Sequence, residues 1–130
     1  MPRNRSVIGL AFLLGCGGTP GMSGGGPVPS PKTVTVAATP DAAFSPFPAT
    51  VAPGGTVTFA FGSLPHNVYF DAAPGAPADI PGANVNTSTT RTFAAAGTYT
   101  YRCRIHPGMK GSIIVSDTTA AISNGTSSHN

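Results

Sequence analysis

Residues 98–109 read TYTYRCRIHPGM, and their first half alternates between polar side chains and aromatic or sulfur side chains. A period of two predicts a strand with one buried face, which here carries Tyr99, Tyr101 and Cys103. The second half contains a Pro-Gly pair, which favours a tight turn. The sequence therefore predicts a strand that ends in a short loop bearing cysteine, histidine and methionine.

Other short runs along the chain alternate in the same way. They occupy residues 33–36 and 56–61, and together with a further short run at residues 112–115 they are rich in β-branched and aromatic residues. Turn-forming residues separate them: residues 52–55 read APGG, and residues 74–82 contain three prolines and two glycines, which predicts a loop. Many short strands and no helix of normal length predict an all-β fold, either a sandwich or a barrel.

The N-terminal residues have the pattern of an export signal. Arg3 and Arg5 precede an apolar run at residues 7–14, which is shorter than the ~20 residues that a membrane-spanning helix needs. The run ends in LLGC, which resembles the bacterial lipobox, and this resemblance implies that Cys16 is lipidated. Residues 1–15 are therefore predicted to be a lipoprotein-type signal peptide. An ordinary signal peptide cut nearby is the alternative.

The rest of the chain divides by composition. Residues 16–31 are rich in glycine and then in proline, which predicts a lipid-anchored flexible linker. Residues 32–116 hold the predicted strands and form a single small domain. Residues 117–130 have few apolar side chains to bury and are expected to be a disordered tail. If Cys16 is acylated, Cys103 is left as a lone thiol in an exported domain, where a bound metal is its obvious occupant.

The charge of the chain is small and excludes a nucleic-acid-binding surface. Seven basic and four acidic residues give a formal charge of +3, but two of the arginines lie in the predicted signal peptide, which leaves +1. Three basic residues lie close together at Arg102, Arg104 and Lys110. This basic cluster is either an ordinary solvated surface or a surface that steers an acidic partner.

The candidate metal site combines Cys103, His106 and Met109, in a C-x2-H-x2-M spacing, with His66 upstream. A thiolate, two imidazoles and a weak thioether are the donor set of a trigonal blue-copper site with an axial methionine. Zinc prefers a harder fourth ligand, and iron–sulfur clusters need more cysteines. The donor set therefore predicts one type 1 copper ion.

These residues resemble the plastocyanin/amicyanin/pseudoazurin group of cupredoxins. The resemblance rests on TYTYRC with His106 and Met109, on PHNV at residues 65–68, and on APGGTVTF at residues 52–59. The short loop spacing is most similar to that of amicyanin. The resemblance implies an eight-stranded Greek-key β-sandwich, in which the loop-like residues 70–90 leave one strand degraded. It also implies that the backbone of Asn67 donates a hydrogen bond to the copper thiolate, and that Tyr99 is a core residue.

The resemblance implies an exported, periplasmic or extracytoplasmic electron carrier that is a monomer and not an enzyme. Electrons would pass through the exposed ring edge of His106 to redox protein partners. Copper enzymes of this fold need further histidine-rich sites, and the chain has only three histidines. A copper storage or delivery protein is the alternative, and a zinc-stabilised binding module is a more distant one.

Overall fold

The alternating run predicted around residues 56–61 lies in the middle of one sheet. In the computed structural model, which describes residues 27–119, strand β5 (Gly55–Phe61) buries every second side chain. It pairs in parallel with β2 (Thr33–Ala38) and antiparallel with β8 (Thr87–Phe93). The short strand β3 (Phe44–Ser45) joins β2 and completes a four-stranded sheet in the order β3-β2-β5-β8.

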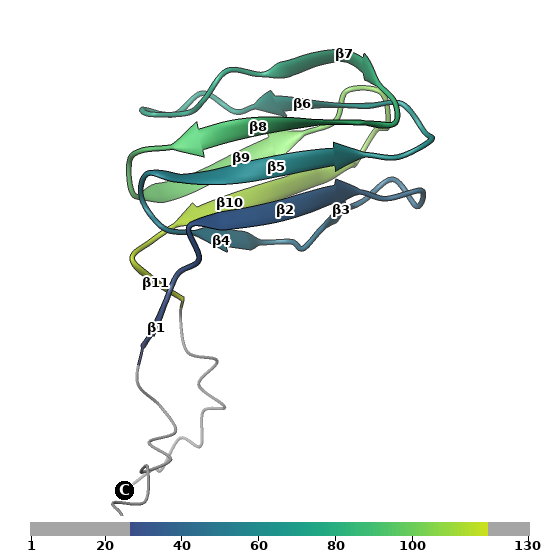
Figure 1. The fold of residues 1–130 in the computed structure, drawn as a ribbon. Coiled ribbons are helices and arrows are strands. Elements are labelled where there is room, and N and C mark those ends of the chain that lie inside the picture. Colours follow the sequence, from purple (N-terminus) through teal and green to yellow (C-terminus); the bar gives the residue numbers. More distant parts are fainter. Residues whose placement is uncertain (1–26, 120–130) are drawn as a thin grey trace, which may run out of the picture.

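A five-stranded sheet packs against the first one (Figure 1), and both contribute to a single hydrophobic core. Its order is β4-β10-β9-β6-β7. The bounds are Ala49–Val51 for β4, His66–Phe70 for β6, Ile80–Asn84 for β7, Gly97–Arg102 for β9 and Lys110–Val115 for β10. The all-β sandwich expected from the sequence is confirmed.

Residues 70–90 contain more strand than the sequence predicts. The expectation of a loop over residues 74–82 is wrong at its end, because β7 begins at Ile80 and includes Pro81 and Gly82. A proline and a glycine are tolerated there because β7 is the edge strand of its sheet. Strand β8 was missed because its side chains are mostly threonine and serine, which give little hydrophobic signal.

The two ends of the domain come together in a small separate ladder. Strand β1 (Val28–Pro29) pairs with β11 (Thr118–Thr119), and the Ser30 N–H donates to the Asp117 carbonyl at 3.0 Å. Strand pairing thus extends on both sides beyond the expected domain of residues 32–116. The predicted signal peptide, Cys16, and most of the predicted linker and tail lie outside the described residues. Between residues 27 and 119 the chain forms no helix that is long and apolar enough to cross a membrane.

The strand directions give the domain two distinct poles. Because β2 and β5 run in parallel, the start of β2 lies at the opposite pole from the end of β5, where the chain turns into β6 at His66. Strand β6 runs antiparallel to β9, so the loop from Cys103 to Met109, which follows β9, lies at the pole where β6 begins with His66. The β1–β11 ladder leaves from the other pole (Figure 1).

An aromatic cluster fills the core beneath the β9–β10 loop. The ring of Tyr101 packs edge-to-face on Phe44, Phe59 and Phe70, with centroid distances of 4.8, 5.3 and 5.7 Å. Tyr101 lies opposite Gly111 on the neighbouring strand, and its ring covers that residue. A Cβ atom at Gly111 would lie 2.8 Å from Cε2 of Tyr101 and closer still to Cζ.

We predict that Gly111→Ala lowers the free energy of unfolding by about 1–3 kcal/mol, because the ring of Tyr101 is held by three other aromatic rings and cannot move aside. Urea denaturation of the copper-free protein measures the effect. The control is Gly62→Ala, since a Cβ atom at Gly62 meets no atom within 4 Å. Equal stability of the two variants would contradict the prediction.

Candidate metal centre

Three donor side chains from two separate parts of the chain meet at the His66 pole. His66 begins β6, Cys103 directly follows β9, and His106 lies in the loop before β10. The Cys103 Sγ atom lies 4.0 Å from Nδ1 of His66 and 3.8 Å from Nδ1 of His106. All three donor atoms lie within 4.8 Å of one another. Two imidazole nitrogens thus face one sulfur atom across a gap of the size that a metal ion fills.

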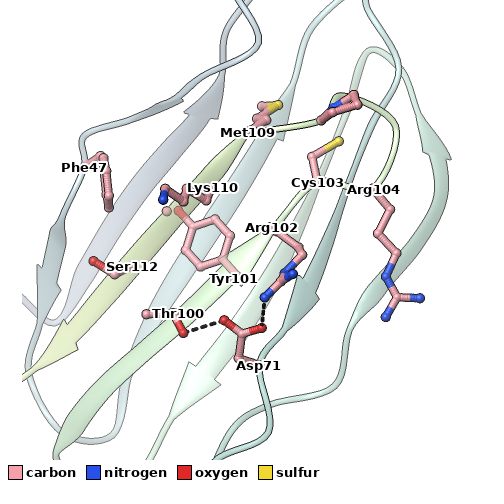
Figure 2. Close-up of a pocket in the computed structure, with 13 residues that line it drawn as sticks. Phe47, Asp71, Thr100, Tyr101, Arg102, Cys103, Arg104, Met109, Lys110 and Ser112 are labelled. Carbon is pink, nitrogen blue, oxygen red and sulfur yellow. Dashed lines mark hydrogen bonds and ion pairs between the residues drawn. The ribbon is translucent and has the colours of Figure 1, made fainter.

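The fourth predicted ligand, Met109, directly precedes β10 and is 2% exposed. Figure 2 shows the side chains of Met109 and Cys103 at the same end of the β9–β10 face. The Cys103 N–H donates to the Met109 carbonyl at 2.9 Å, and the Met109 N–H donates to the His106 carbonyl at 3.1 Å. These two bonds close the loop and hold its three side chains at one pole.

The donor set fits a copper ion better than any other ordinary occupant. His66 is fully buried, and its Nε2 atom has no hydrogen-bond partner among the described residues. Burial lowers the pKa of His66, and the neighbouring His106 lowers it further. The backbone at Thr39 raises this pKa, but its effect is the smallest of the three. A neutral imidazole is the form that binds a metal. Two imidazoles, a thiol and a thioether together match the blue-copper donor set.

Asn67 lies beside the donors, and the structure gives a role to its side chain. Its Oδ1 accepts a hydrogen bond of 2.7 Å from the N–H of Arg104, the residue after Cys103, and its Nδ2 donates to the Gly82 carbonyl at 3.0 Å. Asn67 therefore ties β6 to the chain that follows Cys103 and to β7. The backbone bond from Asn67 to the sulfur of Cys103, which the resemblance implies, stays a prediction.

The donors differ in their access to solvent. His66, Cys103 and Met109 are buried, whereas His106 is partly exposed. Two exposed apolar side chains lie in the loops at this pole, Leu64 at 40% and Ile105 at 38% exposure. His106 is thus the donor through which the buried centre reaches the surface.

The basic cluster lies next to the donors, with Arg102 and Lys110 on the outer face of β9 and β10 and Arg104 in the loop that follows β9. It lines a surface pocket of about 700 Å³ that also includes Cys103, Met109 and the exposed Phe47 (Figure 2). Asp71 accepts hydrogen bonds of 2.6 Å from both Thr100 and Arg102, and the bond from Thr100, followed by that from Arg102, lowers the pKa of this carboxyl. Arg102 is therefore paired with an acid.

Three side chains around the centre were not predicted from the sequence. Tyr69 lies under the guanidinium of Arg104, whose Cζ is 3.8 Å from the ring centroid, and Asp71 pairs with Arg102. Asn84 donates to the main chain of His66. Tyr69 in β6 and Asp71 directly after it are two residues apart and so lie on one face of the extended chain, but no sequence pattern indicates the role of Asn84.

Comparison with known proteins gives the same result as the donor set. The family described as copper binding proteins, plastocyanin/azurin family, matches residues 31–116. Amicyanin-alpha of Methylorubrum extorquens is 44% identical over 55 residues, which are 41% of this chain and 46% of that protein. The chain therefore spans less than half of that relative.

Solved structures with the same fold include two cupredoxins. A point mutant of amicyanin, in its reduced Cu(I) form at pH 4, is similar with a TM-score of 0.57 and 30% identity, over 65% of this chain and 82% of that one. A pseudoazurin from Sinorhizobium has a TM-score of 0.52 and 32% identity, over 65% and 73% of the two chains. Because the family match covers the whole sandwich and its donor residues, the chain belongs to the plastocyanin/azurin family of copper binding proteins.

Proposed function

We propose that this domain holds one copper ion between His66, Cys103, His106 and Met109 and carries one electron at a time between extracytoplasmic redox proteins. The observation that carries the proposal is the position of the Cys103 sulfur, which lies within 4.0 Å of an imidazole nitrogen of both histidines. The membership of the family supports copper as the metal.

Four protein donors support a carrier rather than an enzyme. They would fill the coordination sphere of a type 1 site, so that no position is left for a substrate. When bound, copper supplies reversible one-electron chemistry between its Cu(I) and Cu(II) states. The two closing bonds of the loop keep the donors in place in both states. The domain would accept one electron from a reduced partner and pass it to an oxidised partner. No proton and no leaving group is transferred in this reaction.

The exposed edge of His106 is the proposed route for the electron. The other three donors are buried, and apolar side chains such as Leu64 and Ile105 offer a docking surface that a partner can desolvate. The basic cluster would then attract acidic partners toward this pole. Its net charge is about two, because Asp71 neutralises Arg102 while Arg104 and Lys110 have no ion-pair partner among the described residues.

The proposed location is the extracytoplasmic side of a membrane, with the domain tethered through a lipid on Cys16. The signal-peptide pattern and the LLGC motif support this location. The opposite poles of the domain support it too, because a tether that enters at the β1 end leaves the His106 end free for partners. A single lipid-anchored monomer is sufficient for this arrangement.

We predict that Cu(II) added to the protein produces an intense blue thiolate-to-copper absorption, which is bleached by one electron and returns on oxidation. Cys103→Ser abolishes the colour, because the thiolate is its source, whereas Met109→Leu retains it. A visible spectrum with a reductive titration makes the measurement. A colourless wild-type protein, or one that loses its copper in each cycle, would point to storage or zinc binding instead.

The basic cluster predicts a charge-dependent reaction rate. The reduced protein should react with the anionic oxidant ferricyanide at a rate that falls as salt rises, and Lys110→Gln should lower that rate at low ionic strength. Stopped-flow absorbance measures it. Lys32→Gln changes the net charge equally but lies at the opposite pole, so it is the matched control. Equal effects of the two substitutions would reject a role for the basic cluster.

The lipobox resemblance predicts that the mature protein begins at a lipidated Cys16. Mass spectrometry of the protein from the membranes of a bacterial host should show a diacylglycerol on the N-terminal peptide, and Cys16→Ser should release the domain into the soluble fraction. Recovery of wild-type protein that is soluble and unmodified would favour an ordinary signal peptide.

A further inference from the structure

The pairing of β6 with β7 is irregular directly beside His66. Two pairs of opposite residues bracket the irregular stretch, His66 with Asn84 and Val68 with Ile80. Three residues of β7 therefore oppose only Asn67 on β6. A bulge of this kind interrupts the backbone hydrogen bonds of the ladder. Other groups must satisfy the carbonyls that the ladder leaves unpaired.

Two asparagine side chains, one from each strand, bridge this bulge. The Nδ2 of Asn84 donates to the carbonyls of His66 at 3.0 Å and Pro81 at 3.2 Å. The Nδ2 of Asn67 donates in the other direction, to the Gly82 carbonyl at 3.0 Å. Gly82 has a φ of +88°, which few other residues adopt, and Pro81 has no N–H to offer. The two amides thus replace backbone donors that this stretch lacks.

The bridged bulge connects to both halves of the metal centre. On one side it holds the carbonyl of His66 through Asn84. On the other side it reaches the chain after Cys103, because Asn67 accepts a hydrogen bond of 2.7 Å from the Arg104 N–H. The bonds to the carbonyls of His66 and Gly82 and the bond from the Arg104 N–H are part-buried, so water competes with them less than with the exposed bond from Asn84 to Pro81. The geometry of the bulge is therefore coupled to the positions of two donors.

We propose that Asn84 is a positioning residue for the metal centre, acting through the main chain of His66. This inference rests on the proposed ligand assignment. Asn84 does not touch a donor atom, and its effect is indirect. It fixes the start of β6 against an edge strand whose own ladder is broken at that point. Without its amide, the carbonyl of His66 loses this hydrogen bond, and the imidazole of His66 becomes free to move relative to the sulfur of Cys103.

The test uses two substitutions of Asn84 in the full chain loaded with copper. Asn84→Asp keeps the shape of the side chain but removes both N–H donors, and Asn84→Ala removes the amide altogether. We expect copper affinity, measured by competition with a chelator, to fall by roughly tenfold or more in both variants. We also expect a changed electron paramagnetic resonance spectrum of the Cu(II) form, because the geometry around His66 relaxes.

Two controls separate positioning from a general loss of stability. Ile113→Val removes a methylene from the buried core near the other edge of the sheet and lowers stability without touching the bulge. It should leave the Cu(II) spectrum unchanged. In the copper-free protein, amide hydrogen exchange at Asn67 and Val68 should speed up in the Asn84 variants more than in Ile113→Val. This measurement needs no bound metal.

The outcomes distinguish this inference from the proposed function. If the Asn84 variants keep the wild-type spectrum and affinity while His66→Ala loses the blue colour, Asn84 is not a positioning residue and the ligand assignment stands. If Ile113→Val changes the spectrum as much as the Asn84 variants do, the effect is one of stability and the inference is overturned. If His66→Ala itself keeps the wild-type colour, the ligand assignment fails and the inference fails with it.

Discussion

Two backbone hydrogen bonds close the loop between β9 and β10, and the metal centre depends on them. Arg102 and Lys110 form the last pair of the β9–β10 ladder, and the bond from the Cys103 N–H to the Met109 carbonyl continues that ladder by one step. The bond from the Met109 N–H to the His106 carbonyl closes the turn formed by residues 106–109. Sheet pairing and these two bonds therefore hold three donors in one loop. The conformational entropy of ordering them is lost when the sheet forms.

Different regions of the domain surface carry different chemical groups. One pole holds the donors, three of them buried and His106 partly exposed, so the centre is shielded from water yet open along one imidazole edge. The outer face of β9 and β10 beside it, with the loop that follows β9, carries the basic cluster and the pocket next to Phe47. The other pole holds both ends of the described chain in the β1–β11 ladder. A partner at the His106 pole and the proposed tether at the β1 end would therefore not compete for the same surface.

Sequence patterns predicted the features that depend on residues close together in the chain. Alternation identified β5 and β9, because each of these strands has one buried face, and the C-x2-H-x2-M spacing identified the loop because its donors are neighbours in the chain. Strand β8 was missed because its threonines carry little hydrophobic contrast. The roles of Asp71 and Asn84 were missed for another reason. Their partners lie 31 and 18 residues away, and only the folded sheet brings them together.

The close arrangement of the donor side chains within the fold also bears on how the centre would work. A site that is formed by the fold itself adds its binding free energy to the stability of a small domain, since ligand binding favours the state that already fits. The same arrangement limits how far His66 and Cys103 can move when the charge on the metal changes by one. Asn67 and Asn84 contribute to both effects, because they join the two donor-bearing segments to an irregular edge strand. On this proposal, the contacts around the bulge of β7 would contribute both to stability and to a low cost of rearrangement.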